Sequence, residues 1–198
     1  MSRFAVSYFL IILVAIGASS ATFAGQEKPG TQEKVYLLRG LTNVLSPGID
    51  QLANDLRNKN ISATVTNHLF WNSLAAEAIQ DCRSGHVNSI VLVGHSLGAS
   101  AAVSMAEQLQ QAGIHVALIV TLDPVTKTSV PGNVHLLENF YLSSGLGVPV
   151  ERGEHFHGLL RNVDMAHTEL GHLSVTTAPT IQKQVMNDIM AAAKTRCR

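Results

Sequence analysis

The stretch that decides the fold is residues 89–98, which reads SIVLVGHSLG. Its first half is an almost continuous apolar run, which is typical of a strand buried on both faces of a parallel sheet. Its second half has the pattern Gly-x-Ser-x-Gly, and a segment rich in alanine and serine follows. A strand, a sharp turn and a helix in this order raise a serine hydroxyl above the carboxyl edge of a sheet. The stretch therefore predicts a nucleophilic serine, Ser96, at the turn.

Outward from this stretch, β-like apolar runs alternate with helical segments along the body of the chain. The alternation predicts an α/β fold with a mainly parallel sheet of about five to six strands and helices on both faces. The first helix has Ser46 as its expected N-cap and Pro47 at its first position. Residues 143–158 lack periodicity, which is typical of a functional or mobile loop. The expected strands cover residues 35–41, 61–66, 89–93, 115–122, 134–142 and 161–165, and the expected helices cover residues 47–60, 72–82, 97–111 and 180–194.

The composition limits the classes of function. A chain of 198 residues, 46% of them hydrophobic, is long enough for one domain with a sizeable core. The 14 basic residues balance the 14 acidic ones, which excludes nucleic-acid binding through a basic face. Two cysteines exclude a disulfide-dense miniature scaffold.

The N-terminus has the features of a secretory signal. Arg3 precedes an apolar run over residues 4–18, and small residues follow up to Ala24. We therefore expect a cleaved signal peptide over residues 1–24 and a secreted or periplasmic protein, with an uncleaved membrane anchor as the alternative. Residues 25–34 are polar and predict a flexible leader, so the domain is expected over residues 35–198.

In this context the chain resembles the α/β-hydrolase superfamily, whose lipases and esterases typically contain the GHSLG stretch. The domain is too short for a helical cap, so the resemblance is to small secreted lipases and cutinase-like esterases. It implies a minimal α/β-hydrolase fold without a cap domain. It also implies a catalytic serine, acid and histidine in that order along the chain.

A serine hydroxyl needs a base to remove its proton. His172 lies just before the last expected helix, where the resemblance places the base. His167 and then His157 are the alternatives. His95, next to the serine in sequence, is expected to pack and to line the site, because its side chain should point away from the nucleophile.

The acid must orient the imidazole and stabilise its charged form. Asp123 ends the apolar strand after the expected elbow, in the sequence Leu-Asp-Pro, which is similar to that of pancreatic-type lipases. Asp164 is the alternative acid, because many members of the superfamily place this residue one strand later. The expected oxyanion hole uses the N–H of Leu97 and one N–H from Gly40 or Leu41.

No cofactor and no metal are expected. His155, His157, Glu151 and Glu154 share one irregular loop, which is a weak metal signal, and no zinc or phosphate-loop motif occurs. Cys82 ends the second expected helix, and Cys197 follows the last one. Helices in this fold run opposite to the strands, so both cysteines should lie away from the active site, and we expect a disulfide between them.

These observations predict an exported serine hydrolase that cleaves carboxylic esters through Ser96, His172 and Asp123. The expected partners are a small-molecule or lipid ester and, transiently, a lipid surface; no nucleic-acid partner is expected. The alternatives are a thioesterase or acyltransferase using the same triad, or a catalytically silent binding module on a hydrolase fold.

Overall fold

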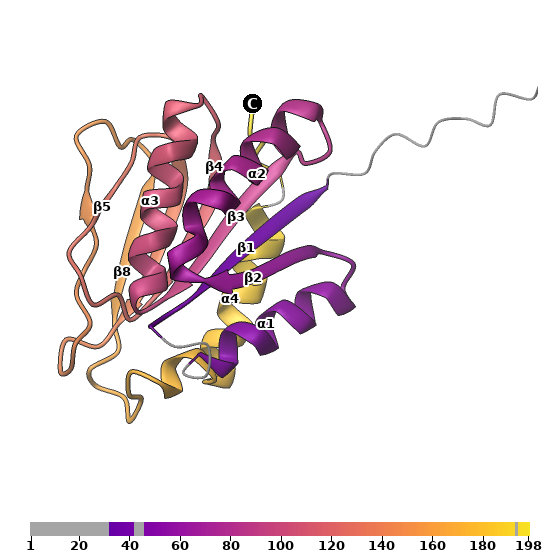
Figure 1. Ribbon diagram of the computed structural model, residues 1–198. Helices are drawn as coiled ribbons and strands as arrows, with labels where there is room; N and C mark the ends of the chain where they lie inside the picture. The colour runs from indigo at the N-terminus through magenta and orange to yellow at the C-terminus, as the bar shows by residue number, and fades with distance from the viewer. Residues whose placement is uncertain (1–31, 42–45, 193) are drawn as a thin grey trace, which may run out of the picture.

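The computed structural model describes residues 32–41, 46–192 and 194–198, so the expected signal peptide lies outside the described residues. Its centre is a six-stranded parallel sheet with strand order β2-β1-β3-β4-β6-β8 (Figure 1). β3 and β4 are buried along their whole length, as expected for central strands of a parallel sheet. The strands are β1 (Glu33–Arg39), β2 (Ser62–Asn67), β3 (Ser89–His95), β4 (Val116–Leu122), β6 (Val134–Tyr141) and β8 (Leu159–Asp164).

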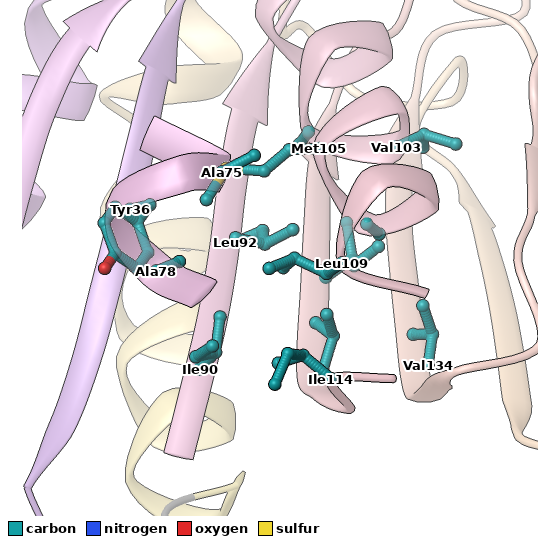
Figure 2. Close-up of a cluster of buried hydrophobic side chains, with 14 of the residues drawn as sticks. Tyr36, Ala75, Ala78, Ile90, Leu92, Val103, Met105, Leu109, Ile114 and Val134 are labelled. Atoms are coloured by element: carbon teal, nitrogen blue, oxygen red, sulfur yellow. The ribbon is translucent and has the colours of Figure 1, made fainter. Parts of the chain in front are cut away.

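Helices cover both faces of the sheet. Apolar side chains from α2 (Trp71–Ser84) and α3 (Leu97–Gln111) pack on one face, in a cluster that includes Tyr36, Leu92 and Leu109 (Figure 2). Side chains from α1 (Pro47–Asn58) and α4 (Pro179–Ala192) pack on the other face. This arrangement confirms the expected α/β-hydrolase fold class with six strands.

In the part of the chain that the structure describes, the connections between strands contain α1, α2, α3 and the long loop after β6. They add two 3-10 turns, η1 (His68–Phe70) and η2 (Ser174–Thr176), and a two-stranded pairing of β5 (Ser129–Val130) with β7 (Glu151–Arg152). No further domain is evident among these residues. The site at the sheet edge therefore has no helical cap over it in the described chain.

β1 begins two residues earlier than the sequence pattern indicates. Glu33 and Lys34 pair in register with Ser89 and Ile90 of β3, although both are polar and lie in the expected leader. Polar residues at a strand end give no hydrophobic signal, so only the pairing with the neighbouring strand shows where β1 starts.

The expected disulfide is confirmed. Cys82 and Cys197 are bonded, with their Cα atoms 6.4 Å apart. Cys82 lies near the C-terminus of α2, and the backbone of Cys197 hydrogen-bonds to Asn88 and His115 beside the amino ends of β3 and β4. The bond therefore fastens the C-terminal tail at the edge opposite to the carboxyl ends of the strands. Among the described residues, no helix has the length and apolar character needed to cross a bilayer.

Candidate active site

The turn after β3 holds Ser96 in a strained conformation. Ser96 has φ 58° and ψ −122°, a region that residues with a side chain rarely adopt. The flanking glycines are required by close packing. A Cβ at Gly94 would lie 2.1 Å from the carbonyl oxygen of Gly98, and a Cβ at Gly98 would lie 2.1 Å from the carbonyl oxygen of Leu38. The Gly-x-Ser-x-Gly pattern thus meets two separate steric needs of this turn.

His172 contacts both Ser96 and Asp123, the other two residues of the expected triad. Its Nε2 lies 3.0 Å from Ser96 Oγ, and its Nδ1 lies 2.6 Å from Asp123 Oδ2. A carboxylate only accepts hydrogen bonds, so Nδ1 carries the proton in the neutral ring and Nε2 accepts from the serine hydroxyl. Ser96, His172 and Asp123 therefore form one continuous hydrogen-bonded chain.

The structure distinguishes between the two candidate acids. Asp123 is fully buried, and its Oδ1 accepts a hydrogen bond of 2.8 Å from the backbone N–H of Leu142 while Oδ2 faces His172. Asp164 instead accepts hydrogen bonds from Ser143 and from the N–H of Ala166. These hydrogen bonds lower the pKa of the Asp164 carboxyl, and they hold it at the carboxyl end of β8 on partners other than His172.

The alternative bases lie elsewhere. His157 lines a shallow surface cavity together with His115 and His135, near the amino ends of β4 and β6. His167 interacts electrostatically with Asp164. His172 is therefore the candidate base that contacts Ser96, whereas His157 and His167 lie beside other groups.

Two backbone regions meet at the serine. α3 begins at Leu97, so the free N–H groups of its first turn lie beside Ser96 and favour developing negative charge. Gly40 is the other neighbour, because a Cβ placed on it would lie 3.1 Å from Ser96 Cβ. The Gly40 N–H donates to Ser46 Oγ at 3.3 Å, and its carbonyl accepts from His68 Nδ1 at 2.9 Å.

These bonds bear on the choice between Gly40 and Leu41 as the second oxyanion donor. The Gly40 carbonyl and the Leu41 N–H belong to one planar trans peptide, so they point in opposite directions. The contact with His68 therefore fixes the direction of the Leu41 N–H. The Gly40 N–H already has a partner in Ser46, which leaves Leu41 as the donor that the geometry favours.

The sequence did not reveal the contacts of His95. Its ring is buried, and it lies with its centroid 4.8 Å from that of His172. Nδ1 is 2.8 Å from Ser46 Oγ and Nε2 is 2.8 Å from the backbone carbonyl of His172. Burial lowers the pKa of His95 to about 4. The side chain points away from Ser96 as expected, but it reaches the backbone of His172.

The aperiodic loop after β6 packs over Asp123. A Cβ at Gly147 would lie 1.9 Å from Asp123 Oδ1, and Val148 N–H donates to the carbonyl of Pro124 at 2.9 Å. Asn139, buried in β6, donates to the Val148 carbonyl at 3.2 Å. The loop is thus fastened to the sheet beside the triad. The lack of periodicity marks this loop in the sequence but does not predict this role, since the contacts join segments far apart along the chain.

The metal hypothesis for this loop has no support in geometry. Within the described ranges, no group of three or more His, Cys, Asp or Glu side chains is arranged to hold a metal ion. A cavity of about 800 Å³ does open at the amino ends of β1 and β2, lined in part by Glu33, Lys34 and Met190. It lies at the sheet edge opposite to Ser96, so it is separate from the triad.

Comparisons with known proteins agree with this description. The chain is similar in structure to the type II thioesterase BorB from the borrelidin biosynthetic cluster, with TM-score 0.54, 13% identity and coverage of 80% of this chain and 93% of that one. It is less similar to the RedJ thioesterase from the prodiginine pathway of Streptomyces coelicolor (TM-score 0.49, 10% identity, 82% and 88% covered). A cutinase-like protein from Cryptococcus sp. gives TM-score 0.49 and 17% identity, with 83% and 96% covered. At such identities these likenesses concern the fold alone, and no curated protein matches the chain.

The sequence-family comparison is more specific. The model of the thioesterase domain matches residues 39–139, which is just over half of the 198 residues. The matched region includes Gly40, the turn with Ser96 and the candidate acid Asp123. The fold, the hydrogen-bonded Ser96–His172–Asp123 chain and this match lead to one conclusion: the chain belongs to the thioesterase domain family of α/β-hydrolases.

Proposed function

We propose that this protein is a serine hydrolase that cleaves acyl thioesters, with Ser96 as nucleophile, His172 as base and Asp123 as the acid that orients His172. The observation that carries the proposal is the thioesterase-domain match over residues 39–139, which includes Ser96 and Asp123. The contacts of 3.0 and 2.6 Å around His172 support these roles. Asp164 bonds to other groups, so it has no role in the proposed reaction.

In the first half of the reaction, Ser96 Oγ attacks the thioester carbonyl while His172 Nε2 takes the hydroxyl proton. The negative charge on the carbonyl oxygen is stabilised by the Leu97 N–H and by the Leu41 N–H, with Gly40 as the alternative donor. The C–S bond then breaks. The leaving sulfur receives the proton from His172, and the acyl group stays on Ser96.

In the second half, water attacks the acyl-serine carbonyl, and His172 takes a proton from the water. The C–O bond to Ser96 breaks, the serine oxygen recovers the proton, and a carboxylic acid leaves. Each half uses the same donors and the same base. A thiol and an acid are therefore the two products, and no oxidant or reductant is needed.

Exposed apolar side chains indicate the nature of the acyl group. Most large exposed hydrophobic residues in the described chain lie in segments that follow the carboxyl ends of strands or flank the triad. Isolated exposed apolar residues are common, but a group of them around a reactive centre marks a binding surface. We therefore expect an apolar acyl chain to lie along this rim. The residues of the rim are Leu41, Leu69, Phe70, Leu146 and Leu173.

A carboxylic ester is the second candidate substrate, because the same triad serves both reactions and the GHSLG turn resembles that of lipases and esterases. The test compares a thioester and an oxygen ester with the same acyl chain, for example an octanoyl thioester and its ester analogue, in wild type and Ser96→Ala. Released thiol is read with a thiol reagent. The protein adds no background, since both of its cysteines are in the disulfide.

The proposal expects a higher kcat/KM for the thioester, and loss of nearly all turnover in a folded Ser96→Ala. A higher kcat/KM for the oxygen ester would favour the second candidate. If folded wild type hydrolyses neither substrate and forms no adduct with a fluorophosphonate, the catalytic proposal is wrong. The binding-module hypothesis would then take its place.

We also propose that the protein is exported through its N-terminal segment. The disulfide between Cys82 and Cys197 supports this proposal, because disulfides persist mainly in oxidising compartments. N-terminal sequencing of the protein from its native cells tests it. A mature N-terminus at Gly25 is expected, and an intact Met1 in the cytoplasmic fraction would contradict export.

A further inference from the structure

We propose that Ser46 and His95 are positioning residues of the reaction, and that together they link the Gly40–Leu41 segment to the backbone of the base His172. The inference rests on the proposed function, since it concerns the same site. Neither residue touches the reacting atoms. Their part is to fix the distance between the two regions that must act together on the carbonyl.

The contacts form one unbroken path. Gly40 N lies 3.3 Å from Ser46 Oγ, Ser46 Oγ lies 2.8 Å from His95 Nδ1, and His95 Nε2 lies 2.8 Å from the carbonyl oxygen of His172. Ser46 has no exposed surface and His95 has 1%. The path therefore runs behind Ser96, through the protein interior, from the end of β1 to the loop that carries the base.

The direction of every proton on this path follows from its ends. A backbone carbonyl only accepts, so His95 Nε2 carries a hydrogen. Burial keeps the His95 ring neutral at ordinary pH, with a pKa of about 4, so Nδ1 has no hydrogen and accepts from the Ser46 hydroxyl. The Ser46 oxygen can then accept from the Gly40 N–H. Each group donates once toward His172, and a neutral histidine is the side chain that both accepts at one end and donates at the other.

The hydroxyl of Ser46 is diverted from its usual task. Ser46 is the N-cap of α1, and Pro47 follows at the first helical position, but the serine side chain makes no capping hydrogen bond. The hydroxyl instead joins His95 to Gly40. Helix capping therefore does not explain this serine, and the link between two parts of the site does.

The link has a specific consequence for catalysis. The oxyanion donors act mainly on the transition state, so an error in their placement lowers kcat more than it changes KM. A misplacement of about 1 Å is enough to cost about a hundredfold in rate. Removal of the link should hence lower kcat about tenfold to a hundredfold. The KM should stay within a few-fold, because Leu69, Phe70, Leu146 and Leu173 of the apolar rim lie outside the linked segment and only Leu41 belongs to it.

The test uses two deletions, one rescue and one matched control. Ser46→Ala and His95→Leu remove the link, whereas His95→Gln keeps an amide donor where Nε2 lies. Ser89→Ala is the control, because Ser89 is a buried serine of the same β3 strand whose hydroxyl faces the carbonyl of Ala192 at the opposite end. Each variant is measured for Tm, for kcat and KM on the thioester, and for its rate of reaction with a fluorophosphonate.

The inference expects the two deletions to slow both reactions at temperatures well below their Tm, with His95→Gln several-fold faster than His95→Leu and Ser89→Ala at the wild-type rate. Equal rates in Ser46→Ala and wild type would overturn it, as would equal rates in His95→Gln and His95→Leu. If His95→Leu does not fold, the rates of Ser46→Ala are compared with those of Ser89→Ala, and this comparison decides whether the link matters. The fluorophosphonate needs no thioester substrate, so a wild type that reacts with it but cleaves no thioester refutes the substrate and leaves this inference tested.

Discussion

Substitution of Gly147 by alanine should disable the proposed acid, Asp123, without replacing any residue of the proposed triad. Gly147 lies in the loop after β6, with a φ outside the left-handed region, so alanine brings no backbone strain there. Its added Cβ would lie 1.9 Å from Asp123 Oδ1 and 2.6 Å from the backbone nitrogen of Leu142. The carboxylate also accepts a hydrogen bond from that nitrogen, so the methyl group would enter between two bonded partners.

The size of the effect follows from these distances. Carbon atoms do not approach closer than about 3.0 Å in such contacts, so the carboxylate or the loop must move by at least about 1.1 Å. If the carboxylate moves, the Asp123–His172 contact of 2.6 Å lengthens to as much as about 3.7 Å, which is no longer a hydrogen bond. We expect kcat to fall about a hundredfold. Crowding should also cost about 1–3 kcal/mol of unfolding free energy.

The assay measures kcat, KM and Tm for Gly147→Ala beside Gly145→Ala. Gly145 is a matched control in the same loop, because its Cβ would meet only the carbonyl oxygen of Leu142 at 3.8 Å. The double variant Gly147→Ala/Asp123→Ala should have about the same kcat as Asp123→Ala, since the methyl group acts on kcat through the carboxylate. Its contact with the Leu142 nitrogen remains and should lower Tm alone. If Gly147→Ala keeps a kcat within threefold of Gly145→Ala, the reasoning from this contact is refuted.

Three further predictions concern the acid, the disulfide and pH. Asp123→Asn should lower kcat by roughly 10²–10⁴-fold and Asp164→Asn should leave it near wild type; the reverse order in steady-state kinetics would reinstate Asp164 as the acid. Replacement of Cys82 and Cys197 by alanine removes a link across 115 residues, so calorimetry should show a loss of about 4 kcal/mol with the 20 °C rate unchanged, and a lost rate in the folded variant would contradict a distant structural bond. The pKa of His95 is about 4 in the folded protein and about 6.5 in the unfolded chain. The unfolding free energy should therefore fall by about 3 kcal/mol as the pH drops from about 6.5 to about 4. His172 and Asp123, which face His95, are unchanged in His95→Gln. Denaturant titrations should therefore show a shallower fall of unfolding free energy with decreasing pH in His95→Gln than in wild type. Equal slopes would contradict the assignment of this pH dependence to His95.

The fold could be predicted from the sequence because the patterns that indicate it are local. The apolar runs of β3 and β4 need no partner to be recognised, since a strand buried on both faces must be apolar throughout. Gly94 and Gly98 likewise indicate the turn from the sequence alone, because a Cβ at either position would meet backbone atoms at about 2 Å. The start of β1 was misplaced for the opposite reason. Glu33 belongs to the sheet only through its pairing with Ser89, which no local pattern records.

The site was readable in part. The proposed nucleophile Ser96 follows from the motif, and the resemblance supplied the order of acid and histidine along the chain. The choice between Asp123 and Asp164 depends on which carboxylate lies against His172, and the choice between Gly40 and Leu41 depends on where Ser46 and His68 direct the peptide. Both are questions of direction, which residue type and spacing leave open.

The sequence by itself determined the alternation of strands and helices, the strained turn at Ser96 and the two cysteines that form the disulfide, because each depends on residues adjacent in the chain or on the direction in which helices run between parallel strands. Only the tertiary structure decided how Ser46 is used. Its local sequence indicates a helix cap, but His95, 49 residues away, offers a buried acceptor that the hydroxyl must satisfy. The same is true of Gly147, whose lack of a side chain matters because Asp123 and the backbone of Leu142 lie against it. Contacts between distant segments assemble the site, and their geometry exists only once the sheet has formed.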